Sequence, residues 1–302
     1  MTKIEYHIPV LLHECLEGLN LRSDGSYVDV TFGGGGHSRK ILECLTTGKL
    51  IVFDQDARAI ENLTQDSRVI GVNQNFRFMR NFLRYHNVLP VDGILADLGV
   101  SSHQFDTAER GFSTRFDGPL DMRMNPNSDT SASLVIASFD EFSLMKMFRD
   151  YGELDHANRI AKTIIQARAN DPIQTTNDLK QALSHIAPKG KENQFFAQVF
   201  QALRIEVNNE LEVLKELLRQ SLKSLKPGGR LVVISYHSLE DRLVKNIMKS
   251  GNFEGEVSTD VFGNRTIPFK LITKKPILPS AEEMMSNPRS RSARLRIAEK
   301  VE

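Results

Sequence analysis

Two hydrophobic periodicities alternate along the first hundred residues. Short apolar runs of the kind that form buried strands are separated by longer segments with the apolar spacing of amphipathic helices. The predicted strands lie at 27–30, 50–53, 68–72 and 93–96, with helix-length segments at 38–45 and 57–65 between them. Strands that alternate with helices are typical of βαβ units. The pattern therefore predicts an α/β fold with a mostly parallel sheet.

Each of these predicted strands ends in a polar or glycine position. A glycine cluster follows the first strand, and Asp54, Asn73 and Asp97 follow the second, third and fourth. The carboxyl ends of parallel strands meet at one edge of a sheet, where such folds bind ligands. We expect the functional site at this edge.

The pattern changes after about residue 107. A polar loop with glycine and proline covers 108–129, and helical segments follow at 140–151, 154–170 and 176–186. The middle segment has a single apolar stripe formed by Ala157, Ile160, Ala161, Ile164 and Ile165. No strand of comparable strength occurs here, so 108–199 is predicted to be an inserted helical domain. It would interrupt an α/β domain made of 1–107 and 200–302.

The α/β pattern returns in the last third of the chain. A long helix is predicted over 200–225, with a stripe at Leu203, Val207, Leu211, Leu214 and Leu218, and Pro227 stops it. The near-continuous apolar run at 231–236 is typical of a strand covered on both faces. The alternating segments 269–272 and 293–297 suit antiparallel edge strands.

Composition narrows the possible functions. The 302 residues are 40% hydrophobic and 25% charged, which is ordinary for a globular protein. No run of eighteen apolar residues and no secretory start occur, so we expect a cytoplasmic protein without a membrane span. The two cysteines, Cys15 and Cys44, lie in amphipathic segments and predict no metal site. The net charge of +1 requires any RNA-binding charge to be local.

The glycine cluster resembles a cofactor loop. Glycine lets the backbone turn sharply and approach a ligand, and the following helix points its N-terminus at that ligand. A nicotinamide loop would carry G-x-G-x-x-G, but Ser38 stands at the sixth position. The spacing D-x-x-x-G-x-G of Asp29, Gly33 and Gly35 instead resembles the first motif of class I S-adenosylmethionine methyltransferases.

Two further positions suit such a cofactor. Asp54 stands 21 positions after Gly33, and an acidic residue at about this distance accepts hydrogen bonds from ribose hydroxyls. Phe76, after the third strand, either packs on the adenine or belongs to the core.

The segment after the fourth strand carries the predicted chemistry. In class I methyltransferases this strand end lies beside the methyl-bearing sulfur, and the enzyme mainly positions the nucleophile. If the acceptor is the exocyclic amine of a base such as cytosine, it is a poor nucleophile, and nearby groups must accept its hydrogens and remove a proton. Asp97, Ser101 and Ser102 are the candidates. Attack on the C5 carbon would need a cysteine nucleophile, and neither cysteine lies at a strand end.

Eight phrases spread over nearly the whole chain identify a more specific family. They lie at 7–11, 31–38, 97–102, 108–113, 118–124, 200–204, 235–242 and 287–292. Together, and in this order, they resemble the bacterial small-subunit (16S) rRNA cytosine-N4 methyltransferases of type H. Gly34 and Tyr236 depart from residues found in some or many relatives, without putting the activity in doubt.

The resemblance implies a Rossmann-like class I domain with an inserted helical domain, in agreement with the pattern. It implies S-adenosylmethionine as cofactor and methylation of the N4 amine of a cytidine in the decoding region of 16S rRNA. The small ribosomal subunit is the expected form of this substrate, but the sequence does not decide between a subunit and naked RNA. The cofactor contacts that it implies, together with the loop glycine Gly33, are Gly35, Gly36, His37, Asp54, Phe76, Asp97 and Gln104.

Substrate contacts are predicted from four further segments. His237 follows the fifth strand and either lines the base pocket or belongs to a turn capped by Ser238 and Asp241. A polar loop is a candidate lid over a base extruded from the RNA. Gln201, Arg204 and Asn208 share one helix face, which either lines the substrate cleft or is solvated. The tail 287–302 has a local charge of +3. It either contacts rRNA phosphates or is a solvated edge strand with Leu295 and Ile297 inward and the arginines outward. The loop residues are Arg110, Arg115, Asp117, Asp121 and Arg123, and the tail cations are Arg289, Arg291, Arg294, Arg296 and Lys300.

Two other functions stay open at this point. One is a methyltransferase on the same fold with another substrate, such as DNA or a small molecule. The other is a non-catalytic rRNA-binding assembly factor, which the complete Gly33, Asp54 and Asp97 set disfavours. The sequence does not predict the oligomeric state, the proton acceptor or a role for 251–279.

Overall fold

The computed structural model describes residues 9–256 and 267–301 and divides the chain into two compact units. The α/β unit comprises Met1–Gly99 and Glu212–Glu302, and the helical unit is Val100–Leu211. The predicted insert, 108–199, begins eight residues later and ends twelve residues earlier than the helical unit. The longer bounds arise because Val100, Phe105 and Val207 pack against the helical core.

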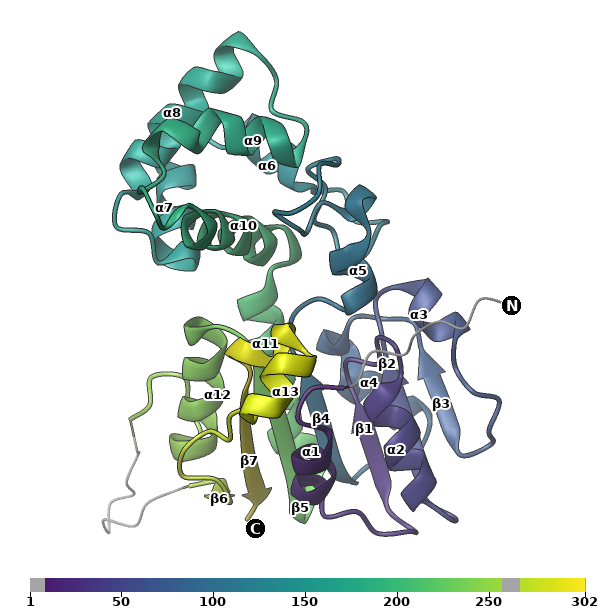
Figure 1. The fold of residues 1–302 in the computed structure, drawn as a ribbon. Coiled ribbons are helices and arrows are strands. Elements are labelled where there is room, and N and C mark those ends of the chain that lie inside the picture. The colour runs from purple at the N-terminus through teal and green to yellow at the C-terminus, as the bar shows by residue number, and fades with distance from the viewer. Residues whose placement is uncertain (1–8, 257–266, 302) are drawn as a thin grey trace. The chain divides into compact units, whose positions relative to one another are not determined.

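The α/β unit is built on one seven-stranded sheet with the order β3-β2-β1-β4-β5-β7-β6 (Figure 1). The first five strands are parallel, and β7 is antiparallel to both of its neighbours. This arrangement confirms the predicted mostly parallel class I fold. The strand bounds are β1 Ser26–Asp29, β2 Lys49–Phe53, β3 Val69–Val72, β4 Val91–Asp97, β5 Leu225–Ser235, β6 Phe269–Leu271 and β7 Arg294–Lys300.

Both faces of the sheet are covered, as the near-continuous apolar runs predict. In β5, Leu231 and Val233 point into one core, whereas Val232 and Ile234 point into the other, because side chains alternate along a strand. Full burial of such a side chain stabilises the fold by about 1.5–3 kcal/mol.

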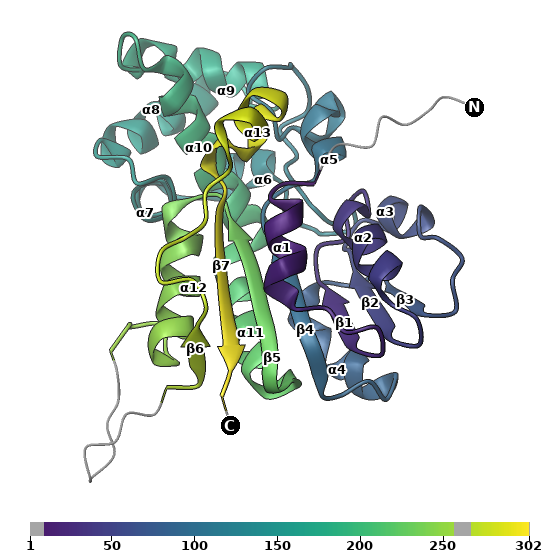
Figure 2. The same cartoon turned by 60° about the horizontal axis from the view of Figure 1, so that its bottom comes forward.

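Helices pack on the two faces of this sheet (Figure 2). α1 (Leu12–Leu19) and α2 (Gly36–Cys44) contribute to one core. α4 (Met79–Tyr85), α11 (Glu210–Ser224) and α12 (Ser238–Ser250) contribute to the other. The remaining short elements are α3 (Ala57–Glu61), α13 (Ala281–Ser286) and the 3₁₀ turns η1 (Phe76–Phe78) and η4 (Pro288–Ser292).

The helical unit consists of α5 to α10 around its own core. Its elements are α5 Ser102–Asp106, η2 Ala108–Arg110, α6 Ala132–Ser138, α7 Glu141–Gly152, α8 Ala157–Asn170, α9 Thr176–Leu183, η3 Ser184–Ile186 and α10 Glu192–Asn208. Phe148, Ile160, Ile164 and Leu203 are fully buried in this core. The three predicted helices of the insert are confirmed. Among the described residues, no helix is long and apolar enough to cross a membrane.

Three predictions about the last third of the chain are wrong in detail. The helix predicted over 200–225 is two helices, because Asn209 adopts the left-handed conformation (φ 50°), which asparagine tolerates better than most residues. The strand predicted to begin at 231 begins at Leu225. β7 is not an edge strand, because β6 pairs on its far side.

Candidate cofactor and catalytic site

The loop after β1 has the backbone of a ligand cradle. Gly33 and Gly35 have positive φ angles of 51° and 72°, and Gly35 is the N-cap of α2. A Cβ atom on Gly35 would lie 2.8 Å from the ring of Phe32, so this position requires glycine. A Cβ atom on Gly34 would meet nothing within 4 Å. At Gly34 the loop thus presents bare backbone to open space at the carboxyl edge of the sheet.

Asp29, at the end of β1, shapes this loop. Its side chain is 1% exposed and accepts hydrogen bonds from the Ser38 hydroxyl (2.6 Å) and the Thr31 amide (3.1 Å). These bonds join the start of the loop to the first turns of α2. The acidic residue of the sequence motif therefore serves the loop rather than facing a ligand.

Asp54, at the end of β2, is held against the same loop. One carboxylate oxygen accepts from the Gly33 amide and the other from the Asp56 amide, each at 2.8 Å. Burial raises the pKa of Asp54 to about 6, although the two amide bonds act in the opposite direction. The side chain is therefore ionised at neutral pH, and its oxygens keep lone pairs for ribose hydroxyls.

Asp97, at the end of β4, is the centre of a partly buried polar group. Its Oδ1 accepts a hydrogen bond from the Tyr236 hydroxyl (2.7 Å), and its Oδ2 lies 3.9 Å from Nδ1 of His37. Burial raises the pKa of Asp97, and both His37 and the Tyr236 hydrogen bond oppose that rise. Burial and the neighbouring Asp97 raise the pKa of Tyr236 well above its ordinary value. The Asp97 amide is fixed by the hydroxyl of Thr31 (2.7 Å).

Tyr236 belongs to the segment 235–238, which follows the fifth strand and is near enough to line the base pocket, but the sequence predicts no contact between Tyr236 and Asp97. A signal existed, because β4 and β5 are neighbouring strands with Asp97 opposite Ile234. A residue two positions beyond Ile234 reaches the same edge as Asp97. His37, which was predicted, is 6% exposed and is oriented by a 3.0 Å bond between its Nε2 and the Val10 carbonyl.

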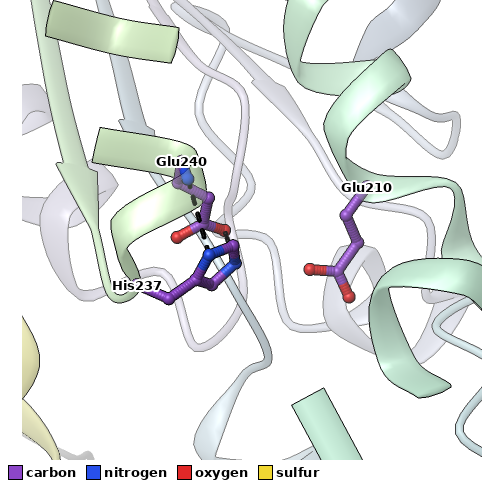
Figure 3. A group of neighbouring side chains, drawn as sticks. All are labelled: Glu210, His237 and Glu240. Carbon is purple, nitrogen blue, oxygen red and sulfur yellow. Dashed lines mark hydrogen bonds and ion pairs between the residues drawn. The ribbon is translucent and has the colours of Figure 1, made fainter. Parts of the chain in front are cut away.

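His237 caps α12, and its side chain faces Glu240 (Figure 3). Nδ1 accepts from the Glu240 amide (3.4 Å), so Nε2 carries the proton. Nε2 lies 3.2 Å from a Glu240 oxygen, and the other oxygen of that carboxylate accepts from the Tyr236 amide (2.9 Å). The predicted cap at Ser238 and Asp241 is therefore wrong by one residue. Glu210, also drawn, belongs to the helical unit.

Phe76 begins η1 and is partly buried against the core to which α4, α11 and α12 contribute. Part of the Phe76 ring therefore belongs to the core, which was one of the two alternatives. The contact of the ring with adenine stays a prediction. The preceding Asn75 caps η1 and donates to Gln55 (2.8 Å), so this turn has a fixed shape.

Three predicted site residues belong to α5 of the helical unit. Ser101 and Gln104 form a capping box in which the Gln104 amide donates to the Ser101 hydroxyl (3.2 Å) and the Ser101 amide donates to the Gln104 side chain (3.1 Å). The side chain of Ser102 lies outside the described part of the structure. The roles of these three residues stay predictions.

The predicted lid loop is held by its own polar side chains. Arg110 donates to the carbonyls of Arg123 (2.9 Å) and Met124 (3.0 Å). Arg123 pairs with Asp121 at 2.7 Å, and this bonding outweighs burial and lowers the pKa of Asp121. Asp117 accepts a hydrogen bond from the first turn of α9 (3.1 Å). The loop is therefore fastened to the helical unit.

The predicted helix face on α10 is also engaged in contacts within the helical unit. Asn208 donates to the Met122 carbonyl (2.8 Å) and accepts from the Met124 amide (2.7 Å). Arg204 forms a two-pronged ion pair with Glu210 at 2.8 and 2.9 Å. Both side chains thus already have internal partners.

The basic tail is only partly a surface feature. Arg291 is exposed and Arg289 is half-buried in η4. Arg296 is 8% exposed and pairs with Asp241 at 2.6 Å, with Arg294 3.5 Å from the same carboxylate. The edge-strand alternative, with the arginines outward, is wrong for Arg296, because β7 is an inner strand with α12 packed on it.

Comparison with known proteins gives full-length similarity. The model of a family described as the MraW methylase family matches residues 5–301. A "Ribosomal RNA small subunit methyltransferase H" from Flavobacterium johnsoniae is 56% identical over 99% of each chain. A protein of the same name from Christiangramia forsetii is 54% identical over 100% of each chain. A solved rRNA methylase from Streptococcus thermophilus is 13% identical, with a TM-score of 0.43, over 100% of this chain and 99% of that chain.

Proposed function

Because the chain belongs to the MraW methylase family, we propose that it methylates the exocyclic N4 amine of a cytidine in 16S rRNA. It is an S-adenosylmethionine-dependent enzyme of the small-subunit methyltransferase H type. Within this activity, our proposal is that the cytidine lies in the decoding region, that the substrate is the small ribosomal subunit, and that the reaction takes place in the cytoplasm.

The observation that carries this proposal is the cradle formed by the glycine loop and Asp54. The open space at Gly34 leaves room for the methionine part of the cofactor, and the Asp54 carboxylate accepts the ribose hydroxyls. S-adenosylmethionine supplies an electrophilic methyl group on a sulfonium sulfur. Gly36, His37, Phe76 and Gln104 complete the proposed cofactor contacts.

Asp97 is the proposed acceptor for the amine. Oδ1 is occupied by the Tyr236 hydroxyl, so Oδ2 accepts a hydrogen of the cytosine amine and orients its nitrogen toward the methyl group. Since burial raises the pKa of Asp97, this carboxylate is a stronger base than an exposed one. His37 lies 3.9 Å from Oδ2 and stabilises its negative charge when protonated.

The remaining predicted residues have supporting roles in the proposal. Ser101 and Ser102 lie near the amine, and Nε2 of His237 contacts the base. The segments that carry Arg110, Asp117, Asp121, Arg123 and Asn208 present the helical unit to RNA, because these side chains hold its loop in shape. Arg204, which is paired with Glu210, supports the end of α10 in the same unit. Arg289 and Arg291 contact rRNA phosphates.

The decisive test is transfer of labelled methyl groups to small subunits from a strain that lacks the gene, followed by nucleoside digestion and mass spectrometry. The expected product is N4-methylcytidine at one decoding-region position. Asp97→Asn should lose orders of magnitude in turnover, whereas Asp155→Asn, at an exposed carboxylate of the helical unit, should match the wild type. Cofactor binding without label on RNA would reject the rRNA substrate.

A further inference from the structure

A shallow groove of about 350 Å³ lies on the α/β unit between α11 and the η1–α4 segment. It is separate from the glycine loop and from Asp97, which do not line it. Arg77, Phe78 and Arg80 contribute from one side, and Glu216, Gln220 and Lys223 from the other.

The walls of the groove are joined by Gln220. Its side-chain oxygen accepts from the Arg80 amide (2.8 Å), and its nitrogen donates to the Arg77 carbonyl and to Glu216 (2.9 Å). These bonds fix the η1–α4 segment against α11, so the groove has a defined shape.

The groove carries positive charge that the protein does not neutralise. Among the described residues, none of the side chains of Arg77, Arg80 and Lys223 has a carboxylate oxygen within 4.0 Å. The buried Nε of Arg80 has no acceptor in the described part of the chain. The acid in the lining, Glu216, is engaged with Gln220 and lies 3.7 Å from Arg219. The groove therefore suits an anionic ligand.

An exposed aromatic ring lies among these cations. Phe78 is 43% exposed, and the guanidinium of Arg77 lies 5.5 Å from its ring centroid. Along α4 the pattern continues with the exposed Arg84 and with Tyr85, which is 78% exposed. Cations that follow a backbone, combined with rings on which bases stack, are the features that bind single-stranded nucleic acid. An acidic peptide would use the charge but not the rings.

We propose that this groove binds a single-stranded segment of the substrate rRNA, with Arg77, Arg80 and Lys223 on phosphates and a base stacked on Phe78. The inference rests on the proposed function. It assigns the α/β unit an RNA contact of its own, away from the reacting amine.

Two variants separate the two kinds of contact. Arg77→Ala/Lys223→Ala should weaken binding to unmethylated small subunits and reduce the slope of log K against log salt by about 1.4, since each phosphate contact to a single strand contributes about 0.7. Phe78→Ala should weaken binding roughly 5- to 150-fold without changing this slope. Lys270→Ala and Phe142→Ala are controls at exposed positions elsewhere and should match the wild type.

The measurements are binding of fluorescent full-length protein to small subunits between 50 and 300 mM KCl, cofactor affinity by calorimetry, and methyl transfer. Unchanged cofactor affinity shows that the variants are folded, and a raised KM for subunits at unchanged kcat supports the groove. Wild-type affinity and slope in the groove variants, with methylation intact, would overturn the inference while the proposed function stands. Absence of rRNA methylation by the wild type would reject the proposed function and the inference with it.

Discussion

Ionisation of Asp54 should destabilise the folded protein as the pH rises through the weakly acidic range. The carboxyl has a pKa of about 6 in the folded chain, against an ordinary value of 3.8. A folded pKa above the unfolded value means that the folded state holds the proton more tightly. The resulting stabilisation is complete below about pH 4 and is lost as the pH rises to about 6.

The size of the effect follows from the two pKa values. They differ by about two pH units, and each unit corresponds to about 1.4 kcal/mol of free energy. Because the carboxylate keeps partial contact with solvent, we expect the free energy of unfolding to fall by about 2–3 kcal/mol between pH 4 and pH 7 through this group alone. Above pH 7 its contribution should be constant.

Asp54→Asn isolates this contribution. Both carboxylate oxygens accept backbone amides, so the asparagine nitrogen must face one of these N–H groups, at a cost that does not vary with pH. Urea denaturation of both proteins from pH 4 to pH 8 gives the difference in free energy of unfolding at each pH. The wild type should lose about 2–3 kcal/mol relative to the variant over this range. A flat difference would refute the argument that burial raises this pKa.

The same ionisation should control cofactor affinity. Ribose hydroxyls donate to the charged carboxylate, so the affinity for S-adenosylhomocysteine should fall about tenfold per pH unit below pH 6. Asp54→Asn should bind weakly at every pH, without this dependence. Calorimetry in buffers of matched ionic strength measures both. If the wild type binds S-adenosylhomocysteine as tightly at pH 5 as at pH 7, Asp54 does not bind the ribose.

Two further predictions concern hydrogen-bonded carboxylates. Tyr236→Phe removes the hydrogen bond that stabilises the charged form of Asp97, so the pKa of Asp97 should rise. A hydrogen bond to a charged group contributes about 1.5–3 kcal/mol, so the acidic side of the pH profile of kcat/KM should move up by about one to two pH units. An acidic side that does not move would contradict this role of Tyr236. Asp241→Ala leaves the buried Arg296 without its 2.6 Å partner, so the free energy of unfolding should fall by about 3–5 kcal/mol, as measured by chemical denaturation. A fall of less than about 1 kcal/mol would mean that the ion pair is solvated.

The sheet and the cofactor loop were predictable because local patterns determine them. The strands at 50–53 and 93–96 are short apolar runs without interruption, and such runs are typical of strands that are buried on both faces of a parallel sheet. The position of Asp54 beside the loop follows from strand adjacency alone. The broken helix at Asn209 was not predictable, because the apolar stripe continues past it and a single left-handed residue leaves no periodic trace.

The polar partners were the least predictable feature, because each is joined by contacts far apart in the chain. Tyr236 and Asp97 are 139 positions apart, and Arg296 and Asp241 are 55 apart. A charged residue on a strand is usually exposed, so alternation alone placed Arg296 outside. Its burial follows from β6, a three-residue strand that converts β7 from an edge into an inner strand.

The distribution of positive charge now has a structural account. A net charge of +1 requires local positive surfaces for RNA. The sequence suggested the tail for this role and the loop 108–129 as a lid over the base. In the structure, Arg123 and Arg296 are instead committed to carboxylates, where they stabilise the fold. Arg77 and Lys223, which no motif marked, have no such partner among the described residues. Since paired cations gain little by turning to phosphate, recognition of rRNA by the α/β unit should depend on the cations that folding leaves unpaired.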